Sequence, residues 1–382
     1  MVNITDKTQC TGCTACASVC AHNAITMQFD EYGHSYPCVD VGVCIDCKLC
    51  EKVCPMLHKE RIPKDEDVDQ LSVYAVYNKD NDIRKQSTSG GIFSLLAEYI
   101  IKKGGIVYAA RFDDKYHILH KSFTALEEIA PYRGSKYAQS DLGDTFRRVK
   151  KDLNEKDVLF VGTPCQVAGL KSYLIKNYDN LYTCDFICMG ISSPVIWEEY
   201  LDAFWNTATI KNIVFKDKRN GWHQWQMLVE DDKGEHLCRG SQDPFFNGYL
   251  THRTYRPSCF ECSYRTCKRV SDFTIADCWG IDKYKPDFDD NMGCTTIILQ
   301  TERAKKIFDS FSDRINSIPY PLACVLESNP YIRKKIIHDP SCNAFYSCRK
   351  THGYKEAALR YSTLKKRSFF IRVINKIKSI LR

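Results

Sequence analysis

The stretches CTGCTACASVC at residues 10–20 and CIDCKLCEKVCP at residues 44–55 decide the fold of the N-terminal part of this chain. Both contain the spacing Cys-x2-Cys-x2-Cys-x3-Cys, so one chemical unit occurs twice. A 4Fe-4S cube needs four thiolates. Three closely spaced cysteines bind three irons of one cube, and the fourth cysteine of the run ligates the other cube. The repeat therefore predicts two 4Fe-4S clusters.

The crossed ligation assigns four cysteines to each cluster. One set is Cys10, Cys13, Cys16 and Cys54, and the other is Cys20, Cys44, Cys47 and Cys50. The alternative interpretation, a pair of zinc knuckles or a disulfide knot, fits less well because a zinc site takes two pairs of cysteines per metal. Ala21 replaces the proline found after the second run, but proline supplies no ligand. Residues 1–60 are therefore expected to form a bacterial-type ferredoxin domain.

The composition fits a globular protein that binds metal in a reducing compartment. The chain has 382 residues and 21 cysteines, and its first residues lack the basic and apolar regions of a secretory signal. No stretch approaches the roughly 18 uncharged apolar residues of a membrane-spanning helix. The net charge of +7 comes from the C-terminal tail, so no nucleic-acid surface is indicated on the body. We expect a cytoplasmic protein.

Strands and helices alternate after a polar linker at residues 61–70. Apolar periodicity predicts strands at 72–77, 106–110, 157–161 and 181–187, and helices at 91–103, 142–153, 165–176 and 194–205. Strands at 213–216, 226–230 and 295–300 are interpreted as an α+β extension. The expected fold class is α+β: a ferredoxin-type domain with two 4Fe-4S clusters, followed by a mixed α/β body at residues 71–345.

Five motifs of the body resemble one known family. They are STSGG at 87–91, RGSKY at 133–137, VGTPCQ at 161–166, RPSCFEC at 256–262 and SDFTIADCWG at 271–280. In this order they resemble the beta-subunit family of coenzyme F(420) hydrogenases and dehydrogenases, over roughly residues 71–320. The resemblance implies a flavin-binding body that holds FAD, with a 4Fe-4S cluster beside it. It also implies electron transfer between the clusters and a hydride-donating or hydride-accepting substrate.

The residues that would bind the flavin lie in three of these motifs. Ser89, Gly90 and Gly91 begin a helix, where free N–H groups suit a dinucleotide phosphate, although an ordinary helix cap is the alternative. Lys136 would neutralise phosphate or lie over the flavin ring, or it is a solvated loop lysine. Gly162 and Thr163 follow a buried strand, where α/β folds gather ligands.

A third cluster would need four thiolates from the body. Cys259 and Cys262 are spaced to bind two corners of a cube. Cys165 and Cys188 are favoured for the other two, with Cys184, Cys267 and Cys278 as rivals. A zinc site with Cys259, Cys262, Cys267 and one more ligand is an alternative, and Cys165 alone also suits a small buried hydrophobe or a nucleophile.

Two departures from the family pattern leave the acid–base residue open. Relatives commonly have histidine at the position of Met189, and phenylalanine at the position of Cys278. His223, His236 and His252 remain candidates, and each is more often a surface or packing residue. The catalytic residues are therefore unassigned.

The tail, residues 346–382, is basic and amphipathic. Its apolar positions share a helical face and basic residues surround it, which suits packing on the body, peripheral contact with the inner face of the membrane, or docking of a partner.

Three functions compete. The leading hypothesis is an iron–sulfur flavoprotein oxidoreductase that receives electrons from, or passes them to, a redox partner protein. Its small-molecule substrate is not readable from the sequence. The alternative is an electron-transfer subunit that serves a partner protein and has no small substrate of its own. A third hypothesis is a cluster-bearing scaffold or sensor without flavin.

Overall fold

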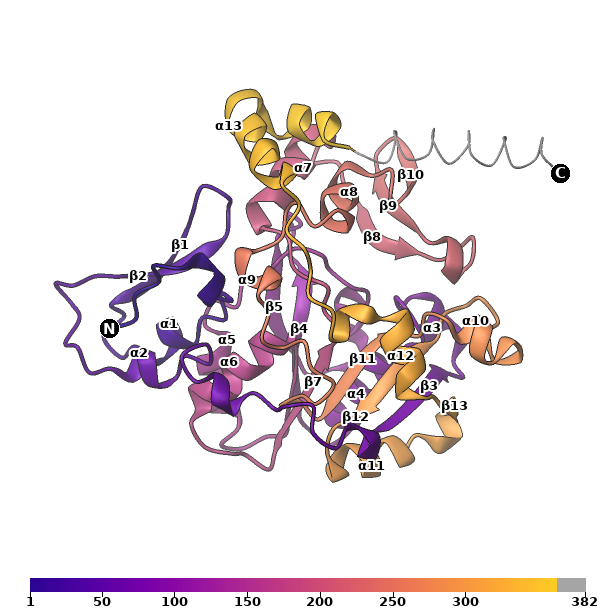
Figure 1. The fold of residues 1–382 in the computed structure, drawn as a ribbon. Coiled ribbons are helices and arrows are strands. Elements are labelled where there is room, and N and C mark those ends of the chain that lie inside the picture. Colours follow the sequence, from indigo (N-terminus) through magenta and orange to yellow (C-terminus); the bar gives the residue numbers. More distant parts are fainter. Residues whose placement is uncertain (363–382) are drawn as a thin grey trace.

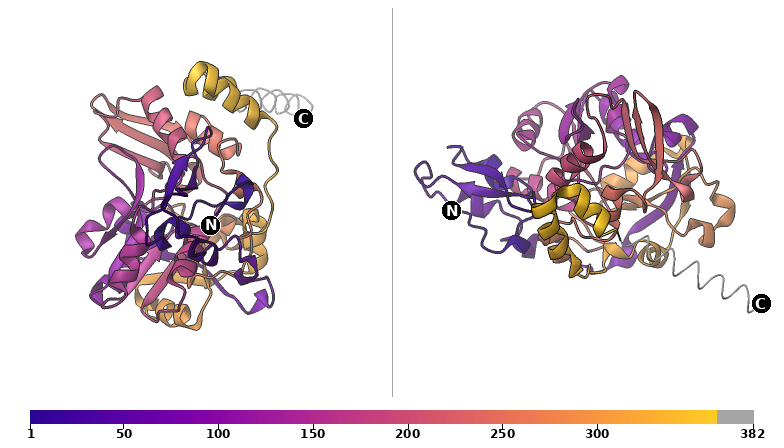
Figure 2. Two further views of the ribbon diagram at one scale, coloured as in Figure 1. Left: turned by 90° about the vertical axis from the view of Figure 1, so that its left-hand side faces the viewer. Right: turned by 90° about the horizontal axis from the view of Figure 1, so that it is seen from above.

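The computed structural model describes residues 1–362, which form a ferredoxin unit, a central body and a second, smaller sheet (Figure 1). The ferredoxin unit contains helix α1 (Ala15–Val19), the antiparallel hairpin of β1 (Ile25–Phe29) and β2 (Ser35–Val39), and helix α2 (Leu49–Lys52). It lies at one side of the body, as the view from above in Figure 2 also shows.

The body is built on an eight-stranded sheet of order β13-β3-β12-β11-β7-β6-β4-β5. Its parallel centre consists of β4 (Ile106–Phe112), β6 (Val158–Val161), β7 (Leu181–Phe186) and β11 (Phe273–Asp277). Antiparallel strands flank it: β5 (Ile118–Phe123) on one side, and β12 (Thr295–Leu299), β3 (Ser72–Asn78) and β13 (Ile315–Pro319) on the other. The carboxyl ends of the parallel strands therefore share one edge of the sheet.

Helices cover both faces of the main sheet because successive residues of its central strands are apolar, and these residues point to opposite faces. Val158 and Phe160 pack toward α5 (Thr145–Asp152) and α6 (Pro164–Leu174), whereas Leu159 packs toward α4 (Ile92–Lys102) and α11 (Glu302–Asp309). Strands buried on both faces are typical of parallel sheets covered by helices. The body is thus a sheet with helices on both faces, and the prediction of a mixed α/β body is confirmed.

The smaller sheet, β10-β9-β8, lies beside the body and carries an aromatic core. Its strands are β8 (Asn212–Asp217), β9 (Gln226–Asp231) and β10 (Gly234–Arg239), and helices α7 (Pro194–Phe204), α8 (Pro244–Leu250) and α13 (Ser341–Arg360) pack near it. Short helices α3 (Asn81–Lys85), α9 (Pro257–Phe260), α10 (Ile281–Tyr284) and α12 (Leu322–Ser328) complete the α-helices of residues 1–362.

The assignment of 295–300 to the extension, together with 213–216 and 226–230, is wrong. This segment is β12, which lies inside the main sheet between β3 and β11. All five of its residues are buried, as expected for a strand covered on both faces. The segment was grouped with the strands that precede it in the chain. Because β12 begins more than a hundred residues after β7, its place in the main sheet cannot be inferred from sequence order.

The ferredoxin unit docks on α5 and α6. Helix α1 contacts both, and a Cβ at Gly169 of α6 would lie 2.9 Å from the Cys13 sulfur, so the absence of a side chain there allows the close approach. Arg147 of α5 donates to the carbonyls of Ala17, Ser18 and Cys20. The segment 61–70, predicted as a linker, is also fastened to the body: Asp65 accepts from the backbone N–H of Cys267 at 2.6 Å and pairs with Arg333.

The predicted tail begins inside helix α13, where Arg349 pairs with Glu199 of α7. The amphipathic stretch that suggested membrane contact lies in residues 363–382, outside the described residues. Among the helices of residues 1–362, none combines the length and the apolar character needed to cross a membrane.

Candidate functional site

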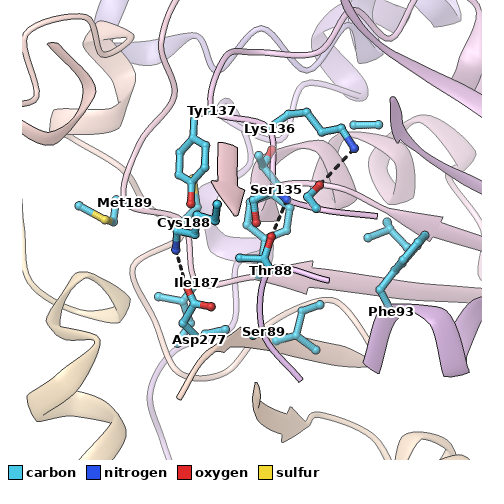
Figure 3. Close-up of a pocket in the computed structure, with 18 of the residues that line it drawn as sticks. Thr88, Ser89, Phe93, Ser135, Lys136, Tyr137, Ile187, Cys188, Met189 and Asp277 are labelled. Carbon is cyan, nitrogen blue, oxygen red and sulfur yellow. Dashed lines mark hydrogen bonds and ion pairs between the residues drawn. The ribbon is translucent and has the colours of Figure 1, made fainter. Parts of the chain in front are cut away.

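A cavity of about 460 Å³ opens where the parallel strands β4, β6, β7 and β11 end. This volume lies within the range of small-molecule sites, about 300–1,000 Å³. Of the residues predicted to bind a flavin, those that line the cavity are Ser89, Gly91, Lys136, Gly162 and Thr163. Gly90 lies behind the wall, where its N–H donates to Thr295 Oγ1 at 2.9 Å. Figure 3 shows the cavity with Ser89, Lys136 and Cys188 labelled.

Two loops form one corner of the cavity and are joined to each other. The loop at residues 87–91 precedes α4, and Gly91, the N-cap of α4, has a left-handed backbone with φ of 82°. Thr88 Oγ1 accepts from the backbone N–H of Ser135 in the loop at residues 133–136, at 2.8 Å. The first N–H groups of α4 have no partner within the helix. This corner therefore suits an anionic group.

Basic side chains surround the same corner. Lys218 Nζ donates to the carbonyls of Arg84, Ser89 and Met292 at 2.8–2.9 Å, which fixes the loop. Arg133 donates to Ser94 and Gln86 beside it. Burial lowers the pKa of Lys136 to about 7, and the charge of Arg111 adds to this shift. Burial and the Arg84 charge lower the pKa of Lys218 to about 7. A bound anion would favour the charged form of both lysines.

The opposite wall carries an ion pair that the sequence did not reveal. Lys216 Nζ donates to Asp277 Oδ2 at 2.6 Å, and the two side chains are 9% and 13% exposed. Burial disfavours the Lys216 ammonium, but Asp277 and Tyr137 outweigh it, so the pKa of Lys216 lies above its usual value. Asp277 Oδ1 is buried without a hydrogen-bond partner among residues 1–362. A ligand N–H or O–H in the cavity would satisfy it.

His120 is the histidine that lines the cavity, and it was not among the candidates. Its Nε2 lies 2.9 Å from the carbonyl of Val161, which only accepts, so Nε2 carries the proton and Nδ1 accepts from Ser140. Burial lowers the pKa of His120 to about 4, which leaves the ring neutral near pH 7. Both ring nitrogens are occupied, so His120 shapes the cavity floor.

The three histidine candidates lie elsewhere. His223 pairs with Asp289, His236 pairs with Asp231, and the ring of His252 packs against Tyr331. None of them lines the cavity. The signal that finds Lys216 and Asp277 is three-dimensional, because β8 and β11 carry them from segments far apart in the chain.

Cys188 lines the cavity and is one of four cysteines, here called the body quartet, that lie near one another: Cys165, Cys188, Cys259 and Cys262. Burial raises the pKa of Cys259 to about 12, with Cys262 and Cys165 adding to the shift. Burial likewise raises the pKa of Cys188, and here Cys259, Cys165 and Cys262 all contribute. Four partly buried thiols that lie beside one another are a donor set that a metal cluster would stabilise as thiolates.

The rivals for this quartet lie apart from it. Cys184 is buried in the core under α4, Cys278 lies beside Cys294, and Cys267 lies at Asp65. Within residues 1–362 no three thiol, imidazole or carboxylate groups converge closely enough to hold a single metal ion. A 4Fe-4S cube is larger than an ion and takes its thiolates at separate corners.

The crossed ligation predicted from the sequence divides the ferredoxin cysteines into two sets, here called the inner and the outer quartet. The inner quartet is Cys10, Cys13, Cys16 and Cys54; burial raises the pKa of Cys13, and the other three add to the shift. The outer quartet is Cys20, Cys44, Cys47 and Cys50. Backbone N–H groups of Ala24, Asp46 and Val2 donate to the sulfurs of Cys20, Cys44 and Cys50 at 3.2–3.4 Å. N–H donors to cysteine sulfur are typical of protein-bound iron–sulfur clusters and tune their potential.

One apolar cluster joins the inner quartet to the body quartet. It contains Met56, Ala168 and Tyr264, with Cys54, Cys165 and Cys262 packed against it. The buried ring of Tyr264 has thiols of both quartets as its electrostatic neighbours. The order from the tip of the ferredoxin unit is therefore outer quartet, inner quartet, body quartet and cavity.

Comparison with known families matches three segments of the chain. Residues 9–57 match a 4Fe-4S dicluster domain. Residues 73–146 match the N-terminal part of the coenzyme F(420) hydrogenase/dehydrogenase beta subunit, and residues 155–317 match its C-terminal part. Both halves of one family therefore follow the dicluster domain in order.

Two individual proteins are similar over part of their length. An uncharacterized protein of Methanocaldococcus jannaschii is 27% identical in an alignment 202 residues long, and the match covers 46% of this chain and 55% of the relative. The match thus spans about half of that relative's length. A chain of the F(420)-reducing NiFe hydrogenase complex from Methanosarcina barkeri is 16% identical, with a TM-score of 0.47, covering 78% of this chain and 92% of that one.

Proposed function

Because this chain belongs to the coenzyme F(420) hydrogenase/dehydrogenase beta-subunit family and carries a 4Fe-4S dicluster domain, we propose that it is an iron–sulfur flavoprotein oxidoreductase. It passes electrons between 4Fe-4S clusters and FAD and reduces or oxidises a small substrate by hydride transfer. The inner and outer quartets would hold two clusters, and the body quartet a third.

The observation that carries the proposal is the position of Cys188. This residue belongs to the body quartet and also lines the cavity where the flavin motifs meet. If Cys188 ligates a cluster, that cluster, which transfers single electrons, lies next to the molecule bound in the cavity, where a hydride would carry two. A flavin accepts electrons singly and returns them in pairs, which is the chemistry that such a junction needs.

The residues of the cavity fit FAD at both ends. The corner formed by the loops at 87–91 and 133–136 would hold the diphosphate, with Lys136 and Lys218 as counter-charges. Asp277 Oδ1 would accept a hydrogen bond from the ligand, and Lys216 holds Asp277 in place. Lys216 remains protonated near pH 7, so it is the cation of this wall and a candidate to supply a proton.

We expect flavin binding to take up a proton at Lys136. Its pKa of about 7 leaves the apo side chain mostly neutral at pH 8, and a diphosphate beside it would raise that pKa. Lys136 should contribute about one proton per flavin at pH 8, to which the uptake by Lys218 is added, and the total should vanish well below pH 6, where both lysines are already charged. Titration calorimetry of flavin-depleted protein in buffers of different ionisation enthalpy measures this number.

The Lys136→Met variant separates the proton uptake at Lys136 from the uptake at neighbouring groups. Uptake at pH 8 should fall to the part that Lys218 contributes, because Lys218 is the other lysine of this corner with a lowered pKa. The flavin affinity of the variant should also depend less on pH between 6 and 9. An uptake equal to that of the unchanged protein would remove Lys136 from the phosphate corner.

The first test of the function is the iron, sulfide and flavin content of anaerobically purified protein. About twelve irons and one FAD per chain would support three cubes beside a flavin. Reduction of the flavin by a low-potential donor, followed by hydride delivery to screened small acceptors, would then identify the substrate class. About eight irons and no flavin would reject the proposal and leave only the ferredoxin unit.

The second candidate, an electron-transfer subunit that serves a partner protein, is favoured by the surface around the outer quartet. Cys47 is exposed there, and so are Val41 at 71% and Ile45 at 63%. Apolar residues around an exposed cluster suit the docking of a redox partner. Both functions need such a partner, so reduction of a small acceptor by the purified chain alone distinguishes them.

A further inference from the structure

Arg256 is a buried cation at the boundary between the ferredoxin unit and the body. It directly precedes α9, which carries Cys259, and it is 1% exposed. Within residues 1–362 no carboxylate lies at ion-pair distance from it. Burying a charge without a counter-charge is strongly unfavourable, so the surroundings of Arg256 should provide a negative charge.

The guanidinium reaches across the boundary into the ferredoxin unit. Its Nε donates to the Cys10 carbonyl at 2.7 Å and its Nη2 to the Ser35 carbonyl at 2.7 Å, while Nη2 lies 3.6 Å from Cys10 Sγ. The ring of Tyr36 lies 4.3 Å from the guanidinium carbon. On the body side, Nη1 donates to Gln139 Oε1 at 3.1 Å.

The ferredoxin loop leaves room for this side chain. Gly12, between Cys10 and Cys13, has φ of 68°, and a Cβ there would lie 2.8 Å from Arg256 Nη1. Only glycine adopts that backbone angle without cost while admitting the guanidinium so closely. The contact is therefore built from both sides of the boundary.

The charge of Arg256 acts on thiols of two quartets. Its Nη2 lies 3.6 Å from Cys10 Sγ of the inner quartet, and it caps α9, where the backbone N–H of Cys259 of the body quartet donates to the Arg256 carbonyl at 2.9 Å. Net charge and hydrogen bonds to sulfur are what set the potential of an iron–sulfur cluster. A cation between two anionic clusters stabilises the reduced state of both.

We propose that Arg256 is the shared counter-charge of the inner cluster and the body cluster, and that it raises both reduction potentials together. This inference rests on the proposed third cluster. It explains why a cation is buried here without a carboxylate: the thiolate-ligated clusters supply the negative charge. Because one cation raises both potentials, it makes both clusters easier to reduce while it changes the driving force between them little.

The test is a redox titration of the full chain, followed by electron paramagnetic resonance, with Arg256→Gln and Arg256→Lys. In Arg256→Gln the inner and body clusters should both shift to lower potential, while the outer cluster shifts much less. Arg256→Lys keeps the charge and should recover part of the shift. Unmoved potentials in Arg256→Gln, or a shift of one cluster alone, would overturn the proposal.

Arg147→Gln is the matched control for docking. Arg147 also crosses the boundary by hydrogen bonds to ferredoxin carbonyls, but it is exposed, so water screens its charge. Potentials of the inner and body clusters should stay unchanged in this variant. Equal shifts in Arg147→Gln and Arg256→Gln would assign the effect to loosened docking and overturn the role of the charge.

A second variant covers the case in which Arg256→Gln does not fold. Gln139→Glu places a carboxylate beside Arg256 Nη1, which offsets the charge of the guanidinium without removing it, so both potentials should again fall. It also removes the hydrogen bonds of Gln139 Nε2 to the Thr11 and Gly12 carbonyls, so Gln139→Met, which loses these bonds and adds no charge, is its control and should shift the potentials less. Unmoved potentials in Gln139→Glu would also reject the proposal. The failure of the proposed function is seen separately, as a low iron content of the unchanged protein.

Discussion

Cys259→Ala should lower the iron content from about twelve to about eight per chain, because one missing thiolate removes a whole 4Fe-4S cube. The visible absorbance of the ferredoxin clusters should remain, since their cysteines lie in a separate unit. Reduction of the bound flavin through the clusters should slow strongly, because the body quartet connects the inner quartet to the cavity. Iron analysis, visible spectra and stopped-flow reduction measure these changes.

Cys267→Ala is the matched control for this variant. Cys267 is also a buried cysteine of the body, but it lies at Asp65 and not beside the body quartet. Its iron content should stay at about twelve. Cys262→Ala should repeat the loss seen with Cys259→Ala. A full iron content in both Cys259→Ala and Cys262→Ala would reject the third cluster.

Much of the architecture was predictable because it follows from local pattern. The prediction of a dicluster ferredoxin domain is confirmed by the match over residues 9–57, since the cysteine spacing itself encodes the ligands. The family resemblance is likewise confirmed over residues 73–146 and 155–317. The mixed α/β character of the body followed from strands and helices that alternate in the chain. The flavin and the third cluster remain proposals.

What the sequence could not give are contacts between segments distant in the chain. Lys216 lies on β8 and Asp277 on β11, and only the arrangement of two different sheets brings them together. The position of His120 in the cavity could not be predicted, because a single histidine in a strand belongs to no motif. Arg256 was visible in its motif, but its role depends on the docking of the ferredoxin unit against α9.

The wrong sheet assignment of β12 also arose because its partners are distant in the chain. Its sequence, TTIIL, indicates a buried strand, but no local signal says which sheet it joins. It pairs with β3, more than two hundred residues earlier, and with β11. This pairing has a consequence for the site, because Thr295 of β12 holds Ser89 and Gly90 through its hydroxyl. The corner of the cavity at residues 87–91 is therefore braced by a strand that the sequence analysis assigned to the other sheet.

Ser89→Asp should weaken flavin binding roughly a hundredfold, or about 3 kcal/mol, if the diphosphate lies at this corner. Ser89 lines the cavity just before α4, so the new carboxylate would face the phosphates. The same charge lies close to Lys218 and to the positive end of the α4 dipole, which should stabilise the flavin-free protein. The variant thus separates binding from folding, because the two should change in opposite directions.

Ser89→Asn is the neutral control, since asparagine has nearly the same size as aspartate and carries no charge. Flavin affinity, measured by fluorescence titration of flavin-depleted protein, should fall far less in Ser89→Asn than in Ser89→Asp. The thermal midpoint of the flavin-free Ser89→Asp protein should equal or exceed that of Ser89→Asn. Equal affinities in the two variants would place the phosphates elsewhere in the cavity, and a lower midpoint with weaker binding would indicate damage to the loop at 87–91 and not repulsion of an anion.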